Sequence, residues 1–233
     1  MELLLRLIGL ARSSFFYHLK PKSDKNVAIS QKIEEIYRKN DENYGYRRIT
    51  LELRKYLIIN HKRVQAIMQR LGLKGKSKQK KYRSYQGKVY LSPIKDLFNN
   101  EIIAYDVARS PSFEQITRML TQAVNRLAGE KPILHSDQGW QYQMMGYREI
   151  LKKHGITQSM SRKGNCLDNG AMESFFGRLK TECYFGKRFE TFEQLEKVIH
   201  EYIHYYNNER IQVKLKGLSP VEYRTQSLNE IRI

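Results

Sequence analysis

The 233-residue sequence holds only two cysteines, Cys166 and Cys183, whose spacing matches neither a CxxC pair nor a zinc-ligand pattern. The sequence therefore supports neither a disulfide framework nor a structural zinc site. Long hydrophobic runs are also missing: the opening stretch MELLLRLIGLARSSFFYHLK is interrupted at Arg6 and is too short to cross a bilayer. The sequence predicts a cytoplasmic protein without a membrane-spanning segment, and a short amphipathic helix at its start.

Acidic residues are absent from one long window of the chain. Between Leu53 and Lys95 there are 13 Lys or Arg and no Asp or Glu, whereas the rest of the chain holds 29 basic and 24 acidic residues. The window thus carries +13 of the formal net charge of +18. Such a balance favours an acidic polymer as the partner, and nucleic acid fits better than a membrane. A solvated basic surface without a special function is the plainer alternative.

The first part of the chain predicts a helical region. Apolar residues recur at helical spacing in QKIEEIYRKN (residues 31–40) and in NHKRVQAIMQRLGL (60–73), and a turn at Gly45 precedes another helix between them. Short helices with a basic last one suit a helix-turn-helix-like DNA-binding region over residues 1–74. A plain helical bundle with a charged face is the alternative. GKSKQKKYRSYQGK (75–88) then reads as a basic linker.

Residues 89–226 have an α/β order of elements. Two apolar stretches around Asn99-Asn100 are typical of a hairpin. Capping boxes at SFEQ (112–115) and TFEQ (191–194) begin two helices, and we expect the first helix to stop at Gly129. KPILHSD (131–137) predicts a short buried strand, and a helix around Tyr147 to His154 follows it. Pro220 in GLSPVEYR predicts a turn.

Two carboxylates stand where chemistry is expected. Asp137 comes at the C-terminal end of its strand, where sites in α/β sheets form. An ordinary loop aspartate that caps a turn is the alternative. Glu173 lies beside the apolar face of a helix that Asn169 can cap, so it can point back toward a strand end. For Glu173 the alternative is a surface helix glutamate, since glutamate is mostly exposed.

Several motifs carry a resemblance to a known family. LHSDQGWQY, SMSRKGNCLDNGAMESFFGRLKTE, YIHYYNNERIQVKLKGLSPVEYR and YGYRRITLEL resemble the transposases of bacterial insertion sequences whose catalytic core is similar to retroviral integrase. They occur in the expected order, and the resemblance covers nearly the whole chain. Thirty-five residues separate Asp137 from Glu173, which matches the second acid and the final glutamate of the family's Asp, Asp, Glu triad.

The resemblance implies a ribonuclease H-like core in which carboxylates hold Mg²⁺ or Mn²⁺ for DNA cleavage and strand transfer. Asp137 and Glu173 are then catalytic metal ligands, with Asn169 and Lys163 as supporting groups. The implied partner is double-stranded DNA, both transposon ends and target, and the implied active form is a homo-oligomer. The candidate DNA-binding residues lie in the helical region, in the linker and before Glu173: Arg47, Arg48, Lys62, Arg63, Arg70, Lys78, Lys80, Lys81, Arg83, Arg162 and Lys163.

One part of the family pattern is missing. The family's first aspartate lies on the first strand of the core, in a segment resembling Trp-x-x-Asp-x-Thr, but here KKYRSYQ runs straight into GKVYLSP. Trp140 is the only Trp and lies on the wrong side of this point, while Asp96 and Asp106 belong to the following hairpin. We interpret this as an internal deletion near Gln86 and Gly87. The neighbours of the lost strand then lack backbone partners, and only a rearranged sheet would let Asp96 substitute.

The deletion changes the expected function. A metal site without one of three carboxylates should bind and position Mg²⁺ poorly, so we expect transposase activity to be impaired or lost. A non-catalytic DNA-binding protein that occupies element ends needs only the basic window and is the main alternative. HEYIH (200–204) also matches the HExxH pattern of zinc metalloproteases. No third zinc ligand is indicated there, and polar positions on the outer side of a helix explain the match as well.

Overall fold

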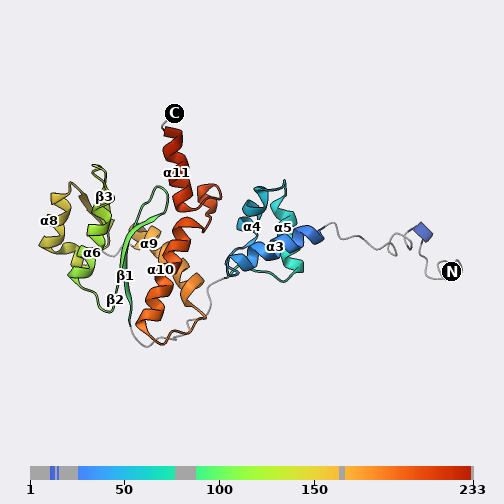
Figure 1. Cartoon of the computed structure of the whole chain (residues 1–233), viewed down its shortest axis with the longest axis horizontal. Helices are drawn as coiled ribbons and strands as arrows, with labels where there is room; N and C mark the ends of the chain where they lie inside the picture. Colours follow the sequence, from blue (N-terminus) through green and yellow to red (C-terminus); the bar gives the residue numbers. More distant parts are fainter. Residues whose placement is uncertain (1–10, 14, 16–25, 77–87, 163–165, 232–233) are drawn as a thin grey trace.

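The computed structural model describes residues 11–13, 15, 26–76, 88–162 and 166–231. The predictions made for the start of the chain, for most of the basic linker and for Lys163 lie outside these residues. Figure 1 shows the described chain as a group of three helices beside a larger part in which helices surround short strands. This mixed architecture confirms the predicted fold class.

The three-helix region is built from α3 (Val27–Lys39), α4 (Tyr46–Arg54) and α5 (His61–Arg70). Each helix turns one apolar stripe toward a common core, in which Ile33, Ile49, Leu53, Val64 and Ile67 are almost fully buried. The residues that carried the helical pattern in the sequence are therefore the ones that pack. This region confirms the prediction of short helices in residues 28–72.

A hairpin follows, made of strands β1 (Tyr90–Lys95) and β2 (Ile102–Ala108), which pair antiparallel. Helix α6 (Phe113–Val124) packs on it, and the side chain of Ser112 caps this helix by accepting from Gln115 N. The amide of Gln115 does not complete the capping box. It donates instead to the carbonyl oxygens of Tyr90 and Asp106, at 2.8 and 3.0 Å. The Gln115 side chain, which was predicted to complete the capping box, therefore joins the helix to both strands.

The predicted end of α6 is wrong. The helix ends at Val124, and Gly129, with a φ of +99°, lies in the loop beyond it. Arg126 N donates to Ala123 O and Leu127 N to Val124 O, so tighter i→i+3 bonds replace the helical pattern before the glycine is reached.

The next strands are β3 (Ile133–Ser136) and β4 (Thr157–Met160), which pair parallel and are connected through α7 (Trp140–Gln143) and α8 (Met145–Lys153). The predicted strand is present, but it is not buried: Ile133 is 70 % exposed. The reason is that β3 has a partner on one side only among the described residues. Among these residues the strands form two separate two-stranded sheets, one of β1 and β2 and the other of β3 and β4.

The last part of the chain is helical. It consists of η1 (Cys166–Asn169), α9 (Gly170–Leu179), η2 (Lys180–Tyr184), α10 (Phe192–Asn208), η3 (Val213–Leu215) and α11 (Pro220–Ile231). Thr191 caps α10 as predicted, whereas Asn169 precedes α9 without a side-chain capping bond. The predicted turn at Pro220 is wrong. Proline suits the first position of a helix, and Ser219 and Glu222 form a reciprocal capping box around it.

The helical region packs against the end of α10. Ile211 lies in the same core as α3 to α5, and its backbone N–H donates to the Tyr44 hydroxyl at 3.0 Å. The Tyr205 hydroxyl donates to Asn40 Oδ1 at 3.3 Å. The described helices include none that is long and apolar enough to span a membrane.

Candidate active site

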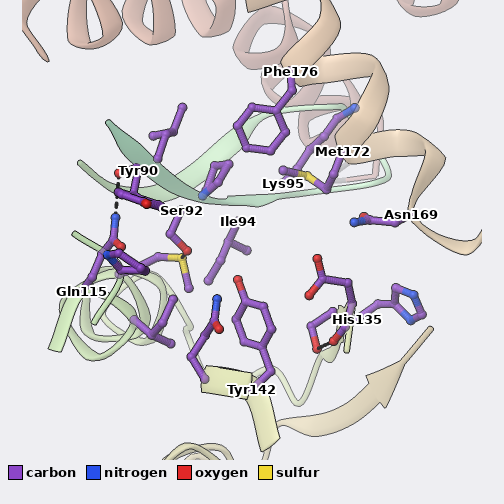
Figure 2. Close-up of a pocket in the computed structure, with 18 of the residues that line it drawn as sticks. Tyr90, Ser92, Ile94, Lys95, Gln115, His135, Tyr142, Asn169, Met172 and Phe176 are labelled. Carbon is purple, nitrogen blue, oxygen red and sulfur yellow. Dashed lines mark hydrogen bonds between the residues drawn. The ribbon is translucent and has the colours of Figure 1, made fainter. Parts of the chain in front are cut away.

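A cavity of about 640 Å³ lies between the two sheets, with α6 on one side and α9 on the other (Figure 2). Its middle is apolar, with side chains from the strands and from both helices. Polar groups gather toward one end, where Figure 2 places Lys95, His135 and Asn169. The residues used below are all part of its lining: Lys95, Gln115, His135, Asp137, Tyr142, Asp168, Asn169, Met172 and Phe176.

Asp137 lines this cavity directly after the last residue of β3. Its Oδ1 accepts a hydrogen bond from Gly139 N at 2.9 Å, so the carboxylate also closes the turn that leads into α7. Two residues before Asp137 lies His135, whose two ring nitrogens are hydrogen-bonded to the hydroxyls of Ser159 and Ser161. The strand end is therefore ordered by its pairing with β4, and Asp137 projects from a supported position.

The structure does not bring Glu173 into the cavity. Glu173 is exposed in the first turn of α9, while Asp168 and Asn169 line the cavity just before that helix. Asp168 is occupied by Arg162, which donates to it from its backbone N and from its guanidinium. These bonds hold the pKa of Asp168 below its ordinary value. Arg162, predicted as a DNA contact, thus has a carboxylate partner.

Two further groups of the cavity escaped the sequence analysis. Burial and then the charges of Arg178 and Lys214 lower the pKa of Lys95 to about 8, and its Nζ lies 3.4 Å from Ala171 O. Burial also raises the pKa of Tyr142, and the nearby charge of Asp137 adds to that effect. Tyr142 belongs to the same motif as Asp137, LHSDQGWQY, but its position in that motif did not indicate that its side chain would line the site.

Exchanging Lys95 for methionine should stabilise the folded protein at pH 7. A lysine pKa lowered in the folded state means that the charged form costs stability, fully below pH 8 and not at all above the ordinary value of 10.5. Because the side chain is partly exposed, we expect a gain of only about 1 kcal/mol, or a few degrees in Tm. Thermal melts of Lys95→Met at pH 7 and pH 10 measure it, with Lys153→Met as control. An equal gain at both pH values would point to methionine packing rather than to the charge.

The cavity does not fit a divalent metal with the residues that the structure describes. A site for Mg²⁺ needs converging oxygen ligands. In the described part of the chain no three His, Cys, Asp or Glu side chains come together as a metal site would require. The Asp137 carboxylate accepts a hydrogen bond from Gly139 N in the following loop, Asp168 is held by Arg162, and Glu173 lies outside the cavity lining. The expected Mg²⁺ or Mn²⁺ site is therefore incomplete among these residues.

The geometry of HEYIH does not favour zinc either. His200 and His204 are exposed on α10. The Nδ1 of His200 lies 2.7 Å from the Tyr105 hydroxyl, and that of His204 lies 3.4 Å from Asn208 Nδ2. Glu201 is 63 % exposed and lies 3.9 Å from Lys197 Nζ. These are the polar positions of a helix whose opposite face is buried.

The candidate DNA-binding residues of the helical region separate into two groups. Arg47 on α4 and Lys62, Arg63 and Arg70 on α5 are exposed. Arg48 instead points inward, where its side chain is 18 % exposed and its Nη1 lies 3.7 Å from Glu182 Oε1. Lys78, Lys80, Lys81, Arg83 and Lys163 fall outside the described residues.

Comparison with known proteins assigns families to the helical region and to the part of the chain that holds the cavity. The family described as integrase core domain matches residues 77–166 and again residues 173–228, and the HTH-like domain family matches residues 24–81. A transposase-like protein of Haemophilus influenzae is 68 % identical over 216 residues, covering 78 % of this chain and 100 % of that protein. The Escherichia coli protein assigned as transposase InsK for insertion sequence element IS150 is 46 % identical over 266 positions, covering 97 % of this chain and 94 % of that protein.

The comparison with solved structures gives matches with low TM-scores. A chain of the simian T-cell lymphotropic virus intasome, solved in complex with the PP2A regulatory subunit B56 gamma, matches with a TM-score of 0.43 and 12 % sequence identity. The match covers 77 % of this chain and 70 % of that one.

Proposed function

Because the chain belongs to the insertion-sequence transposases with an integrase core, we propose that it binds double-stranded DNA through its helical region and that its own residues form only part of the site for DNA cleavage and strand transfer. The bound DNA is an element end. The chain acts there as a homo-oligomer, and its catalytic output is impaired.

One observation carries the second half of this proposal: the described residues of the cavity include Asp137 but no converging set of carboxylates. Asp137 is the acid that the family motif places at a strand end, and the structure supports its position there. Glu173 directly follows Met172, which lines the cavity from α9, so a rotation of α9 about its axis would turn the carboxylate inward. Among the described residues, Asp168 is held by Arg162, and Asp96 Oδ1 accepts from Phe98 N at 2.8 Å in the hairpin turn, so neither is available as a third acid.

The length of the alignment with the Escherichia coli relative supports the interpretation that a segment is missing. The alignment extends over 266 positions, more than the 233 residues of this chain, so at least 33 of those positions have no residue in it. The pattern in the sequence places the gap directly before β1. A strand with the first acid would enter the core at that point.

DNA binding by the full chain should weaken steeply as salt is raised. Each phosphate contact releases counterions, and log K falls by about 0.9 per contact with log [salt]. Lys62 and Arg63 are exposed in the first turn of α5, whose N-cap Asn60 accepts from Lys62 N. We expect Lys62→Ala and Arg63→Ala each to reduce the salt slope by about 1. Fluorescence anisotropy with a labelled duplex from an element end measures both.

Lys152→Ala is the matched control for this titration. Lys152 is exposed on α8, which Figure 1 places at the opposite end of the molecule from α5. Its substitution should leave the slope unchanged. Affinity independent of salt, or an equal loss in all three variants, would contradict a DNA surface on α5.

A further inference from the structure

We propose that the cavity between β1 and β3 is a slot for one extended peptide strand, and that its occupant is the strand segment that intact relatives have and this chain lacks. The inference rests on the proposed function, because it names a partner for the same site. A member of the family with a complete core, or a peptide cut from it, would supply the strand in trans.

The shape of the cavity follows the edges of two strands. It is lined by every residue from Val89 to Lys95 and by every residue from Ile133 to Asp137. Side chains of a strand alternate between its two faces, so a cavity over one face would be lined by every second residue. Lining by consecutive residues therefore means that the cavity runs along the edge of each strand.

Both of these edges are open in the described structure. There β1 pairs only with β2, and β3 pairs only with β4. On the side of β4, Thr157 N donates to Pro132 O, and Ser161 N donates to Ser136 O. Because such groups alternate along a parallel ladder, the N–H and C=O of Ile133 and His135 point away from β4.

On the other side of the cavity, the outer edge of β1 is unpaired among the described residues. Pro93 lies in the middle of this strand and has no N–H, so an added strand would have to bond to β1 through the groups around that position. One extended segment between β1 and β3 can hydrogen-bond to both strands and join the two sheets into one. Unpaired edges of this kind are templates for strand addition.

The size and lining of the slot fit a short strand with one acidic residue. β1 has six residues and β3 has four, so a shared neighbour of about five residues, roughly 17 Å long, matches both. Ile94, Met172 and Phe176 make its walls apolar (Figure 2). Lys95 and Asn169 lie toward one end of the cavity (Figure 2), where an aspartate of the incoming strand would find a cation and an amide.

The chain itself is a poor source of this strand. The stretch directly before β1, residues 77–87, carries Lys78, Lys80, Lys81 and Arg83. Burying these cations in an apolar slot would cost far more than pairing one backbone could return. At least 33 positions of the alignment with the Escherichia coli relative have no counterpart in this chain. Our interpretation of the sequence motifs puts this gap directly before β1, so a strand from the missing segment would enter the core beside β1.

The test uses the full chain and a fluorescein-labelled synthetic peptide that spans the segment of the Escherichia coli relative without a counterpart here. We expect saturable binding by anisotropy, and none for a scrambled peptide. Met172→Trp fills the slot and should weaken binding by about tenfold or more. Met145→Trp is the matched control, since Met145 is 74 % exposed and lies outside the cavity lining. Its affinity should stay within about twofold of the unchanged chain.

Hydrogen exchange on the unchanged chain makes the test independent of how well Met172→Trp folds. The peptide should slow amide exchange in residues 89–95 and 133–137 and leave α3 to α5 unaffected. Equal binding of the scrambled peptide, no binding up to millimolar peptide, or slow exchange at both edges before peptide is added would each overturn the proposal. Salt-dependent DNA binding on the same preparation reports the proposed function separately, because it does not need the slot.

Discussion

Replacing Glu182 with glutamine is expected to lower the free energy of unfolding by about 3 to 5 kcal/mol. Glu182 and Arg210 form a buried ion pair, with side chains 8 % and 0 % exposed. Arg210 donates to both carboxylate oxygens, at 2.6 and 2.7 Å, and the Tyr202 hydroxyl donates to one of them at 3.0 Å. Glutamine keeps the shape but leaves the guanidinium buried without a counter-charge. Denaturant unfolding at pH 7 measures the loss.

The way stability changes at acid pH depends on the same ion pair. Burial acts to raise the pKa of Glu182, but the bonds and charges of Arg210 and Arg48 outweigh it and hold the pKa below the ordinary value of 4.5. A lowered carboxylate pKa contributes stability that is fully present above pH 4.5 and is lost as the pH falls below it. The unchanged chain should therefore lose stability in that acid range more steeply than Glu182→Gln.

Two variants separate the buried charge from other effects of the substitution. Glu201→Gln removes an exposed glutamate that lies 3.9 Å from Lys197 and should change stability by less than about 0.5 kcal/mol. Replacing Glu182 with leucine and Arg210 with methionine together should recover part of the loss, because the fully buried charge of Arg210 is then removed and only Arg48, 18 % exposed, is left without its carboxylate. A double variant as unstable as Glu182→Gln would mean that packing or the charge of Arg48, rather than that of Arg210, accounts for the effect.

This pair also joins the two parts of the molecule. Arg48 of α4 lies 3.7 Å from Glu182, and Arg210 is followed by Ile211, which packs in the core of the helical region. The conformation of α10 is therefore coupled to the position of the helices that we propose for DNA binding. A weakened pair should loosen this junction before either core unfolds.

The sequence predicted local features well and long-range ones poorly. Helices α3 to α6 and α10 were predictable because one apolar stripe defines each of them, and a capping side chain marks the start of α5, α6 and α10. The ion pair of Glu182 and Arg210 joins residues 28 positions apart and leaves no pattern in the sequence. The exposure of Ile133 could not be read either, since KPILHSD looks like a buried strand, and burial depends on a neighbour from elsewhere in the chain. Lys95 entered the site for the same reason, through contacts with α9 that only the fold creates.

The site itself was predicted in part. Asp137 lies at a strand end and lines the cavity, as its motif indicated. The metal-binding role of Asp137 and Glu173 stays a prediction, because the described residues do not converge on an ion. The two open strand edges fit our proposal that a strand is missing, because a strand between β1 and β3 would set the distance between them and bring the first acid to the site.

Inserting the segment that the Escherichia coli relative has, between Gln86 and Gly87, is expected to raise Mg²⁺-dependent cleavage of element-end DNA by at least about 100-fold. The added strand would pair with β1 and β3, fix the position of Asp137 and supply a third carboxylate. Cleavage and strand transfer with Mg²⁺, with Mn²⁺ and after chelation measure the gain. In the repaired protein, Asp137→Asn and Glu173→Gln should each return activity to background.

The decisive control is the same insertion with its aspartate changed to asparagine. This variant restores the sheet without the acid. A rise in Tm with no rise in cleavage would show that the strand stabilises the fold and that its aspartate is needed for the chemistry. Glu201→Gln in the repaired protein should stay active, since Glu201 is exposed on α10. Cleavage by the unrepaired chain that Asp137→Asn removes would show instead that another acid completes the site. The candidate would then be Asp96, which can reach the cavity only if the hairpin turn that it caps rearranges.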